Sequence, residues 1–130
     1  TTEAAHLLQA ELSHQKTIAS STAYAALQRG PVHADLFRDN VMFEGTALTG
    51  FFDFYFAGVD TWLFDLCVAL NDWCIHHTDG SHHADLAQAM LHAYQAVRPL
   101  TDAERQLLPD LLRAGALRFW ISRLWDYHLP

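Results

Sequence analysis

Hydrophobic residues recur at helical spacing over several long parts of the chain. Over Glu3–Arg29, leucine, isoleucine and alanine return every three or four residues, and Gly30 with Pro31 supplies a stop signal. This pattern predicts one long amphipathic helix. Further helices are predicted over Trp62–His76, where apolar residues cover a wide face, and over Ala84–Val97.

The C-terminal part of the chain is predicted to be helical from Thr101 onward. Thr101 and Glu104 form a capping-box pattern, in which the hydroxyl and the carboxylate each satisfy a backbone N–H group of the first turn. Pro109 is expected to interrupt this helix, because proline has no N–H group and its ring clashes with the preceding turn.

Between the first two predicted helices the pattern changes to short β-type runs. Val41–Glu44 and Thr49–Phe52 are separated by turn residues, which predicts a hairpin, and Pro31–His33 is expected to be extended. With the turn centred between the two runs, residues whose numbers sum to about 93 face each other, so that Asn40 faces Asp53. The predicted fold class is therefore α+β, mostly α, in a single domain over the whole chain.

Composition places the chain among globular proteins and limits its partners. Of the 130 residues, 51% are hydrophobic and 18% are charged, which excludes a disordered tail and predicts a substantial core. The net charge of −7 argues against binding to nucleic acid or to an anionic membrane. No apolar run approaches the ~20 residues that a membrane-spanning helix needs, so a cytoplasmic location is expected.

Two groups of residues that often carry chemistry are assigned none. Cys67 and Cys74 lie on one predicted helix, roughly 10 Å apart along its axis, which is too far for a disulfide. Both are predicted to be buried and unreactive. The four histidines from His76 to His83 favour a solvated polar loop over a zinc or nickel site, because their spacing fits no common zinc motif.

Oxygen-bearing side chains gather at the open end of the predicted hairpin. Asn40 and Asp53 supply an amide carbonyl and a carboxylate, which suit Mg²⁺, an ion that takes few protein ligands and keeps water and phosphate oxygens. Asp35 lies in the loop that leads to this end, where a carboxylate can accept the proton of an attacking hydroxyl group. A nearby cation is expected to keep the pKa of Asp35 near its usual low value. Ordinary turn positions are the alternative for these three residues.

The spacing of these residues resembles a known catalytic loop. His33, Asp35 and Asn40 form the pattern H-x-D-x-x-x-x-N, and Asp53 is followed by Phe54, as in the catalytic loop and the metal-binding D-F pair of the protein-kinase-like fold. Residues at these matching spacings favour a catalytic site over ordinary turns.

Two departures from protein kinases indicate a particular branch of that fold. Ala34 stands where protein kinases have an arginine, and Tyr55 stands where they have a glycine. The chain is more similar to the aminoglycoside phosphotransferase and choline kinase family, which phosphorylates small molecules. Within this family it resembles the homoserine kinases, through the segments 30–41, 52–57, 64–66 and 118–124.

The resemblance implies a set of roles for the residues of the loop. Asp35 is implied as the catalytic base, Asn40 and Asp53 as Mg²⁺ ligands, and His33 and Asp65 as supports of the catalytic loop. The implied reaction converts ATP and L-homoserine to ADP and O-phospho-L-homoserine, a step toward threonine. For Asp65, a first-turn carboxylate favoured by the helix dipole is the alternative.

Substrate contacts are expected from the C-terminal helix and from aromatic residues near the site. Arg118 and Arg123 are candidates to bind a substrate carboxylate through paired hydrogen bonds. The candidates for the wall of the pocket are aromatic: Phe119, Trp120 and Trp125 on that helix, together with Tyr55 and Trp73. Core aromatic residues and surface arginines are the alternative for all of these residues.

The resemblance also implies that a lobe is absent from the chain. The protein-kinase-like fold needs an N-terminal nucleotide lobe with a lysine on a strand, but Lys16 is the only lysine and lies in a predicted helix. No G-x-x-x-x-G-K-[ST] pattern occurs, which excludes a P-loop. The chain is thus expected to be the helical C-terminal lobe, with the hairpin carrying the metal site. Alone, it is expected to bind ATP weakly and to self-associate through the exposed lobe interface.

Two alternatives to homoserine phosphorylation stay open. One is another small-molecule kinase of the same family, acting on an aminosugar, on choline or on another small alcohol. The other is a non-catalytic helical interaction module. The intact set of Asp35, Asn40 and Asp53 argues against the module, and the sparse carboxylates of the C-terminal helices argue against an aminosugar.

Overall fold

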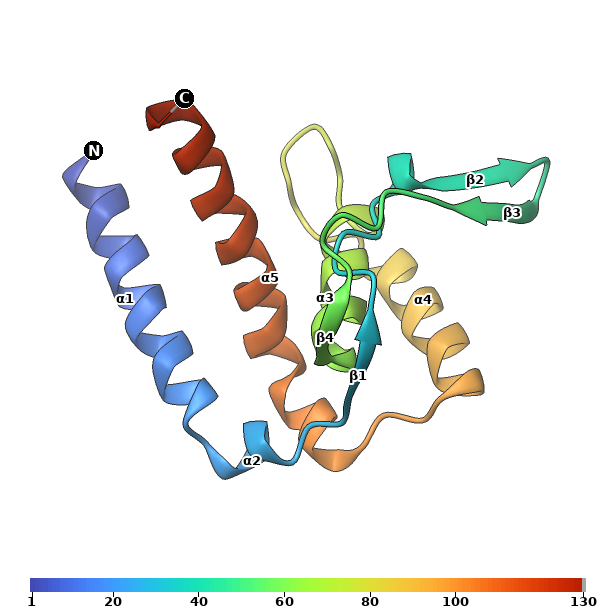
Figure 1. The fold of residues 1–130 in the computed structure, drawn as a ribbon, viewed down its shortest axis with the longest axis horizontal. Helices are drawn as coiled ribbons and strands as arrows, with labels where there is room; N and C mark the ends of the chain where they lie inside the picture. Colours follow the sequence, from blue (N-terminus) through green and yellow to red (C-terminus); the bar gives the residue numbers. More distant parts are fainter. Residues whose placement is uncertain (130) are drawn as a thin grey trace.

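The computed structural model describes residues 1–129, which form five helices and two small antiparallel sheets (Figure 1). The helices are α1 (Thr2–Ala19), α2 (Thr22–Ala25), α3 (Trp62–Trp73), α4 (Ala84–Val97) and α5 (Asp102–His128). The strands are β1 (Arg29–Val32), β2 (Val41–Glu44), β3 (Ala47–Phe51) and β4 (Gly58–Thr61), with a 3₁₀ turn at Arg38–Asn40. The predicted class, α+β and mostly α, is confirmed.

Helix α3 is the centre of the core and packs against both α5 and α4 through one broad apolar face. One part of this face contributes Leu63 and Cys67, which pack against Leu107 and Leu111 of α5 in a cluster that also includes Leu27. An adjacent part of the same broad face contributes Leu66 and Leu70 to a second cluster with Cys74 and Leu100, and Met90 and Leu91 of α4 pack against it. Figure 1 shows α3 between α5 and α4, with the β2–β3 hairpin projecting away from the helices. The wide apolar face predicted for this helix reflects its packing against both helices.

The two cysteines of this region are free and buried, as predicted. Burial raises the pKa of both thiols, because an apolar environment disfavours the thiolate. The Sγ atom of Cys67 lies 3.8 Å from the carbonyl oxygen of Leu108, so α3 and α5 are in direct contact here.

The prediction of one helix over Glu3–Arg29 was wrong. The helix breaks at Ser20 and Ser21, and a separate short helix α2 follows. The hydroxyl of Ser21 donates to the carbonyl of Ile18 at 2.6 Å and accepts from the N–H of Tyr24 at 3.1 Å. Serine thus replaces backbone helical bonds on both sides of the break, a competition that periodicity does not reveal.

The residues after α2 form a strand whose partner the sequence analysis did not predict. Strand β1 pairs antiparallel with β4, from Arg29 opposite Thr61 to Val32 opposite Gly58. It starts two residues before the predicted extended segment. Gly30 is needed at this position, because a Cβ atom there would lie 2.5 Å from the ring of Trp62.

The hairpin was predicted correctly, but its register was wrong. Glu44 pairs with Ala47 around a turn in which Gly45 has a φ of +62°, and an irregularity next to Met42 shifts the pairing further along the strands. Phe52 therefore lies opposite Asn40, and its N–H donates to the carbonyl of Asn40 at 3.1 Å. Asp53 is the next residue along the chain, still at the open end of the hairpin.

Helix α5 contains the predicted capping box, but Pro109 does not interrupt it. The N–H of Glu104 donates to the Thr101 hydroxyl at 3.2 Å, and the Glu104 carboxylate accepts from the N–H of Thr101 at 3.4 Å. The helix continues through Pro109 to His128. Burial of Leu107 and Leu111 on either side of the proline offsets the loss of one backbone hydrogen bond.

The segment between α3 and α4 is an exposed loop whose two ends pair with each other. Helix α3 ends at Trp73, three residues before the predicted end, and a bridge joins Ile75 to His82. The rings of His76 and His83 stack with their centroids 4.6 Å apart. Within residues 1–129, no cluster of three or more histidine, cysteine, aspartate or glutamate side chains has the arrangement of a metal site.

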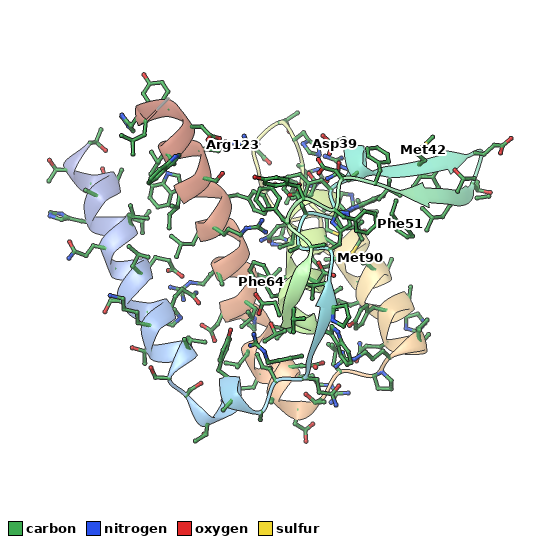
Figure 2. All side chains as sticks on the ribbon, in the orientation of Figure 1. Asp39, Met42, Phe51, Phe64, Met90 and Arg123 are labelled. Atoms are coloured by element: carbon green, nitrogen blue, oxygen red, sulfur yellow. The ribbon has the colours of Figure 1, made fainter. Side chains whose placement is uncertain are left out.

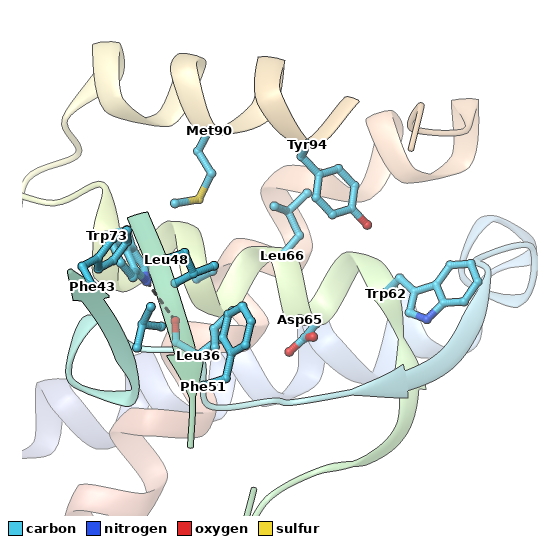
Figure 3. A pocket seen from close by; sticks show the side chains of 12 residues that line it. Leu36, Phe43, Leu48, Phe51, Trp62, Asp65, Leu66, Trp73, Met90 and Tyr94 are labelled. Atoms are coloured by element: carbon cyan, nitrogen blue, oxygen red, sulfur yellow. Dashed lines mark hydrogen bonds between the residues drawn. The ribbon is translucent and has the colours of Figure 1, made fainter. Parts of the chain in front are cut away.

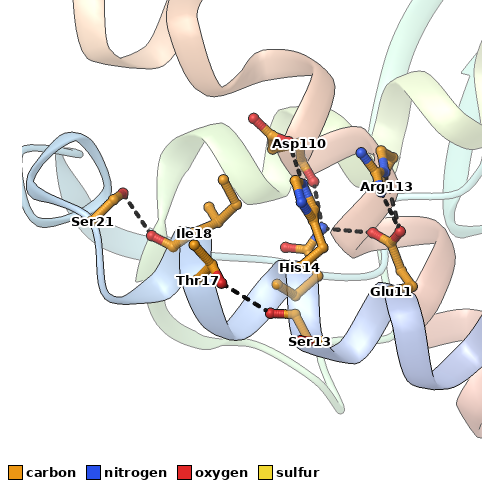
Figure 4. Close-up of polar contacts among 9 residues, drawn as sticks. Glu11, Ser13, His14, Thr17, Ile18, Ser21, Asp110 and Arg113 are labelled. Carbon is orange, nitrogen blue, oxygen red and sulfur yellow. Dashed lines mark hydrogen bonds and ion pairs between the residues drawn. The ribbon is translucent and has the colours of Figure 1, made fainter.

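Helix α1 contacts α5 through polar side chains and contains no buried residue (Figure 4). The Arg113 guanidinium donates to the carboxylate of Glu11 at 2.5 and 3.2 Å, and the His14 ring lies 2.7 Å from an oxygen of Asp110. The Gln15 amide donates to the Asp110 carbonyl at 3.0 Å. These polar bonds hold α1 against α5 together with Ile18, which packs on the hydrophobic core near the end of α1. None of the helices in residues 1–129 combines the length and apolar character needed to cross a membrane.

The α1–α5 contact is expected to weaken in acid. The hydrogen bond from Arg113 holds the pKa of Glu11 below its ordinary value of 4.5, so ionised Glu11 contributes stability above pH 4.5 that is lost as the pH falls through the lowered pKa. Glu11→Gln should weaken the contact by about 0.5–1 kcal/mol at pH 7 and by nearly nothing once Glu11 is protonated. Hydrogen exchange of residues 2–19, compared with wild type at matched pH, measures this; a difference that is the same at both pH values contradicts it.

Candidate active site

The loop between β1 and the 3₁₀ turn carries Asp35 and is held in an unusual conformation. Ala34 has a φ of +65°, in the left-handed region that non-glycine residues rarely adopt. The carboxylate of Asp65, in the first turn of α3, accepts from the N–H of Ala34 at 2.7 Å and from the N–H of His33 at 3.1 Å. Arg118 of α5 donates to the Ala34 carbonyl. Two helices thus hold the backbone immediately before Asp35.

The ring of His33 joins this loop to the segment that leads to Asp53. Its Nδ1 atom accepts from the N–H of Asp35 at 3.2 Å, so the proton belongs on Nε2, which donates to the carbonyl of Phe52 at 2.9 Å. The ring also packs against Phe54, with centroids 4.8 Å apart. His33 therefore sets the position of Asp35 relative to Asp53 through backbone groups on both sides.

Asn40 and Asp53 present oxygen atoms next to Asp35. The buried amide of Asn40 donates to the Asp35 carbonyl at 2.7 Å and lies 3.3 Å from its carboxylate, which directs the amide oxygen away from both bonds. Asp53 follows the hairpin with a φ of +58°. Within residues 1–129, neither the amide oxygen of Asn40 nor the carboxylate of Asp53 accepts a side-chain hydrogen bond. A pair of free oxygens of this kind fits Mg²⁺, which takes one or two carboxylate or carbonyl ligands from a protein.

These residues line one cavity of about 450 Å³ between the loop and the C-terminal half of α5. Figure 2 shows Asp39, beside β2, and Arg123, on α5, toward the same end of the molecule. The cavity is lined by Asp35, Phe37, Asp39, Asn40, Asp53, Phe56, Arg118, Phe119, Ser122, Arg123 and Asp126. The structure therefore brings together six of the predicted site residues, Asp35, Asn40, Asp53, Arg118, Phe119 and Arg123.

The surroundings of Asp35 change its proton affinity. Burial raises the pKa of its carboxyl group, and the Asp53 carboxylate adds to this, whereas Arg118, the Asn40 amide and His33 oppose it. The pKa of Asp35 was predicted to stay near its usual low value beside a cation. Among the protein groups alone burial outweighs the positive charge of Arg118, so Asp35 is a stronger base than an exposed aspartate.

The side chain of Arg118 makes several contacts within the protein, whereas that of Arg123 is largely exposed. Besides its bond to the Ala34 carbonyl, its guanidinium lies 4.8 Å from the ring centroid of Phe56 and 4.9 Å from that of Phe119. Arg123 is exposed and has only a loose contact, 3.8 Å from the carboxylate of Asp126. Arg118 is thus part of the support of the loop.

Four predicted substrate residues do not line this cavity. Trp73 lines a separate apolar cavity of about 320 Å³ between the hairpin, α3 and α4, and its indole N–H donates to the Leu36 carbonyl at 3.0 Å (Figure 3). Tyr55 is 84% exposed and packs on Phe56. Trp120 is half-buried on α5, and Trp125 is exposed on the same helix. The substrate roles of these four residues stay predictions.

Several cavity residues were missed by the sequence analysis. Phe37 of the loop was missed, and its ring centroid lies 4.7 Å from that of Phe119, a residue of α5 that was predicted to wall the pocket and lines the cavity. Ser122 and Asp126 lie on the helical turns around Arg123. Only Asp39 carried a local signal, because it directly precedes Asn40. The others enter the site through tertiary packing, which spacing along the chain does not show.

The chain belongs to the phosphotransferase enzyme family, whose sequence profile matches residues 2–109. This confirms the family resemblance seen in the loop and the D-F pair.

More specific relatives are homoserine kinases. The homoserine kinase of Polaromonas naphthalenivorans is 60% identical over 130 residues, which cover 100% of this chain and 41% of the relative. Those of Ralstonia pickettii and Cupriavidus taiwanensis are 58% and 59% identical over 130 and 129 residues, covering 95% of this chain and 39% of each relative. The chain therefore spans about two-fifths of the length of the curated relatives it matches.

Proposed function

We propose that the complete polypeptide transfers the γ-phosphoryl group of ATP to the hydroxyl of L-homoserine, giving ADP and O-phospho-L-homoserine. The observation that carries the proposal is the placement of Asp35, Asn40 and Asp53 on one cavity, behind a loop that α3 and α5 hold in a left-handed turn. The name of homoserine kinases that are 59–60% identical to this chain over the aligned 129–130 residues supports L-homoserine as the acceptor.

Five residues at the loop and the cavity have distinct parts in this reaction. Asp35 orients the acceptor hydroxyl toward the γ-phosphorus and takes its proton as the new bond forms. Asn40 and Asp53 would hold Mg²⁺, and neutralisation of the phosphate charge is the chemistry that a bound Mg²⁺ supplies. His33 and Asp65 do not line the cavity, and their part is to keep Asp35 in place through hydrogen bonds to the backbone of the loop.

We propose further that the rest of the complete polypeptide supplies the nucleotide lobe. The segment from β3 to β4 beside the site exposes Phe51, Phe54, Phe56 and Val59, an apolar surface that a second lobe would cover. Weak ATP binding and self-association of the isolated chain stay predictions, as does a cytoplasmic location.

The proposal is tested by ADP release from the complete polypeptide with Mg-ATP and a panel of acceptors. The panel contains L-homoserine, L-threonine, choline and an aminosugar. Release specific to homoserine supports the proposal, and release with another acceptor keeps the phosphotransfer but rejects the substrate. No release from folded protein favours a non-catalytic helical module.

Asp53→Ala is expected to weaken Mg²⁺-dependent nucleotide binding and catalysis together. Loss of one of two protein oxygens should lower activity at limiting Mg²⁺ by about 100-fold or more, with partial recovery at high Mg²⁺. Titration of ADP release against Mg²⁺ concentration measures this. Asp85→Ala, which removes a carboxylate at the exposed start of α4, is the control. A loss of the same size at every Mg²⁺ concentration would argue against a ligand role.

A further inference from the structure

The end of α5 presents two opposite charges to the cavity. Arg123 and Asp126 are one helical turn apart, and both line the same cavity as Asp35. Their side chains are 77% and 62% exposed, and the guanidinium lies 3.8 Å from the carboxylate. No other ion pair or hydrogen bond to these side chains occurs within residues 1–129.

The remaining charges of the cavity are already engaged or sit beside the transfer chemistry. One N–H group of Arg118 donates to the Ala34 carbonyl, and its guanidinium packs against two aromatic rings, so the loop and these rings determine its position. Under the proposed function Asp35 and Asp53 face the hydroxyl and the metal, and Asp39 directly precedes the metal ligand Asn40. Among the cavity residues within 1–129, Arg123 is therefore the cation that makes no bond to the loop, and Asp126 is the carboxylate one helical turn from it.

An exposed ion pair of this length contributes little free energy, because solvent screens it and both side chains lose rotamer freedom. Opening the pair to admit a ligand therefore costs little. A ligand that carries both charges restores both interactions as charge-assisted hydrogen bonds, which are stronger than a loose ion pair 3.8 Å long.

Resting on the proposed function, we propose that Arg123 and Asp126 bind the zwitterionic head of an amino-acid substrate. Arg123 binds the α-carboxylate and Asp126 binds the α-ammonium group, while the hydroxyl end of the substrate points to Asp35. The pair rejects acceptors that carry one kind of charge. Choline and aminosugars leave Arg123 without a carboxylate, and a hydroxy acid leaves Asp126 without an ammonium group.

The test compares three acceptors with three forms of the complete polypeptide. The acceptors are L-homoserine, its decarboxylated analogue 3-aminopropanol and its deaminated analogue 4-hydroxybutyrate. The forms are wild type, Arg123→Gln and Asp126→Asn, and kcat and KM are measured by ADP release. Both positions are exposed helix sites, so the variants are expected to fold. Arg105→Gln is the matched control, because it opens an exposed Asp102–Arg105 pair at the opposite end of α5.

Each variant is expected to affect only the acceptors that carry its partner group. Arg123→Gln should raise KM for homoserine by about 10- to 100-fold, with kcat changed by less than about threefold, and should leave 3-aminopropanol unchanged. Asp126→Asn should raise KM for homoserine and 3-aminopropanol and leave 4-hydroxybutyrate unchanged. Arg105→Gln should match wild type with all three acceptors.

The outcomes that overturn this inference differ from those that overturn the proposed function. If wild type phosphorylates homoserine but neither variant changes its KM, or each variant affects all three acceptors equally, the assignment of the pair is wrong and the function stands. If wild type releases ADP only with an acceptor that is not a zwitterion, or with none, both proposals are wrong.

Discussion

Asp35→Asn in the complete polypeptide is expected to lower kcat by about 100-fold or more and to leave the affinity for Mg-ATP nearly unchanged. The side chain loses its capacity to accept a proton but keeps its shape. The role proposed for Asp35 concerns the acceptor hydroxyl, so nucleotide binding should not depend on it. ADP release at saturating homoserine and a nucleotide titration measure the two quantities separately.

The structure explains why this substitution should spare the loop. Asn40 donates mainly to the backbone carbonyl of residue 35, at 2.7 Å, and an asparagine oxygen can accept the weaker bond at 3.3 Å. The Asp65 bonds to His33 and Ala34 do not involve the Asp35 side chain. Asp102→Asn makes the same change at an exposed helix start and should retain full activity. A kcat within about threefold of wild type would remove Asp35 from the mechanism.

Short-range sequence patterns correctly predicted the elements whose stabilising contacts lie within a few residues along the chain. Helix α4 has the predicted bounds, and the capping box of α5 needs only residues that lie three positions apart. Two features were mispredicted, namely the break of the first helix at Ser21 and the continuation of α5 through Pro109. At each position the local sequence is compatible with either a continuous or an interrupted helix, and tertiary contacts decide between them. Strand β4 was missed because its partner lies about 30 residues earlier in the chain.

The same distinction applies to the candidate site. The positions of Asp35 and Asn40 follow from spacing, because a loop of four intervening residues determines how they meet. Arg118 and Ala34 are 84 residues apart, and the acceptor is a backbone carbonyl. The pattern of side chains along the sequence therefore could not predict this hydrogen bond. Arg118 was predicted to bind a substrate carboxylate through paired hydrogen bonds, and this role stays a prediction because Arg118 lines the cavity. Its bond to the Ala34 carbonyl and its packing against aromatic rings show in addition that it supports the conformation of the loop.

A buried ion pair at the start of α5 connects the stability of the fold to the position of the site. Its contacts join α3, α4, α5 and the start of β1. The carboxylate of Glu104 is fully buried and accepts from the guanidinium of Arg98 at 2.6 and 3.0 Å. Arg98 also donates to Gln28 at 2.5 Å, directly before β1, and stacks 4.6 Å from the Trp62 ring at the start of α3. This cluster therefore fixes where β1 begins, and β1 leads to the catalytic loop.

Glu104→Ala is expected to destabilise the protein by about 3–5 kcal/mol, because it leaves the largely buried Arg98 without its counter-charge and removes half of the capping box. Glu104→Gln should cost less, since an amide oxygen still accepts from Arg98 and from the N–H of Thr101. Urea unfolding of the complete polypeptide at neutral pH measures both.

Asp102→Ala in the same helical turn is the matched control for this prediction, and its exposed side chain should contribute no more than about 0.5–1 kcal/mol. If Glu104→Ala costs no more than this control, the buried pair contributes no net stability, and the start of β1 must be held by the packing of Gly30 against Trp62 instead. If the cost is large and ADP release falls with it at temperatures where the variant remains folded, the cluster also controls the geometry of the loop that carries Asp35.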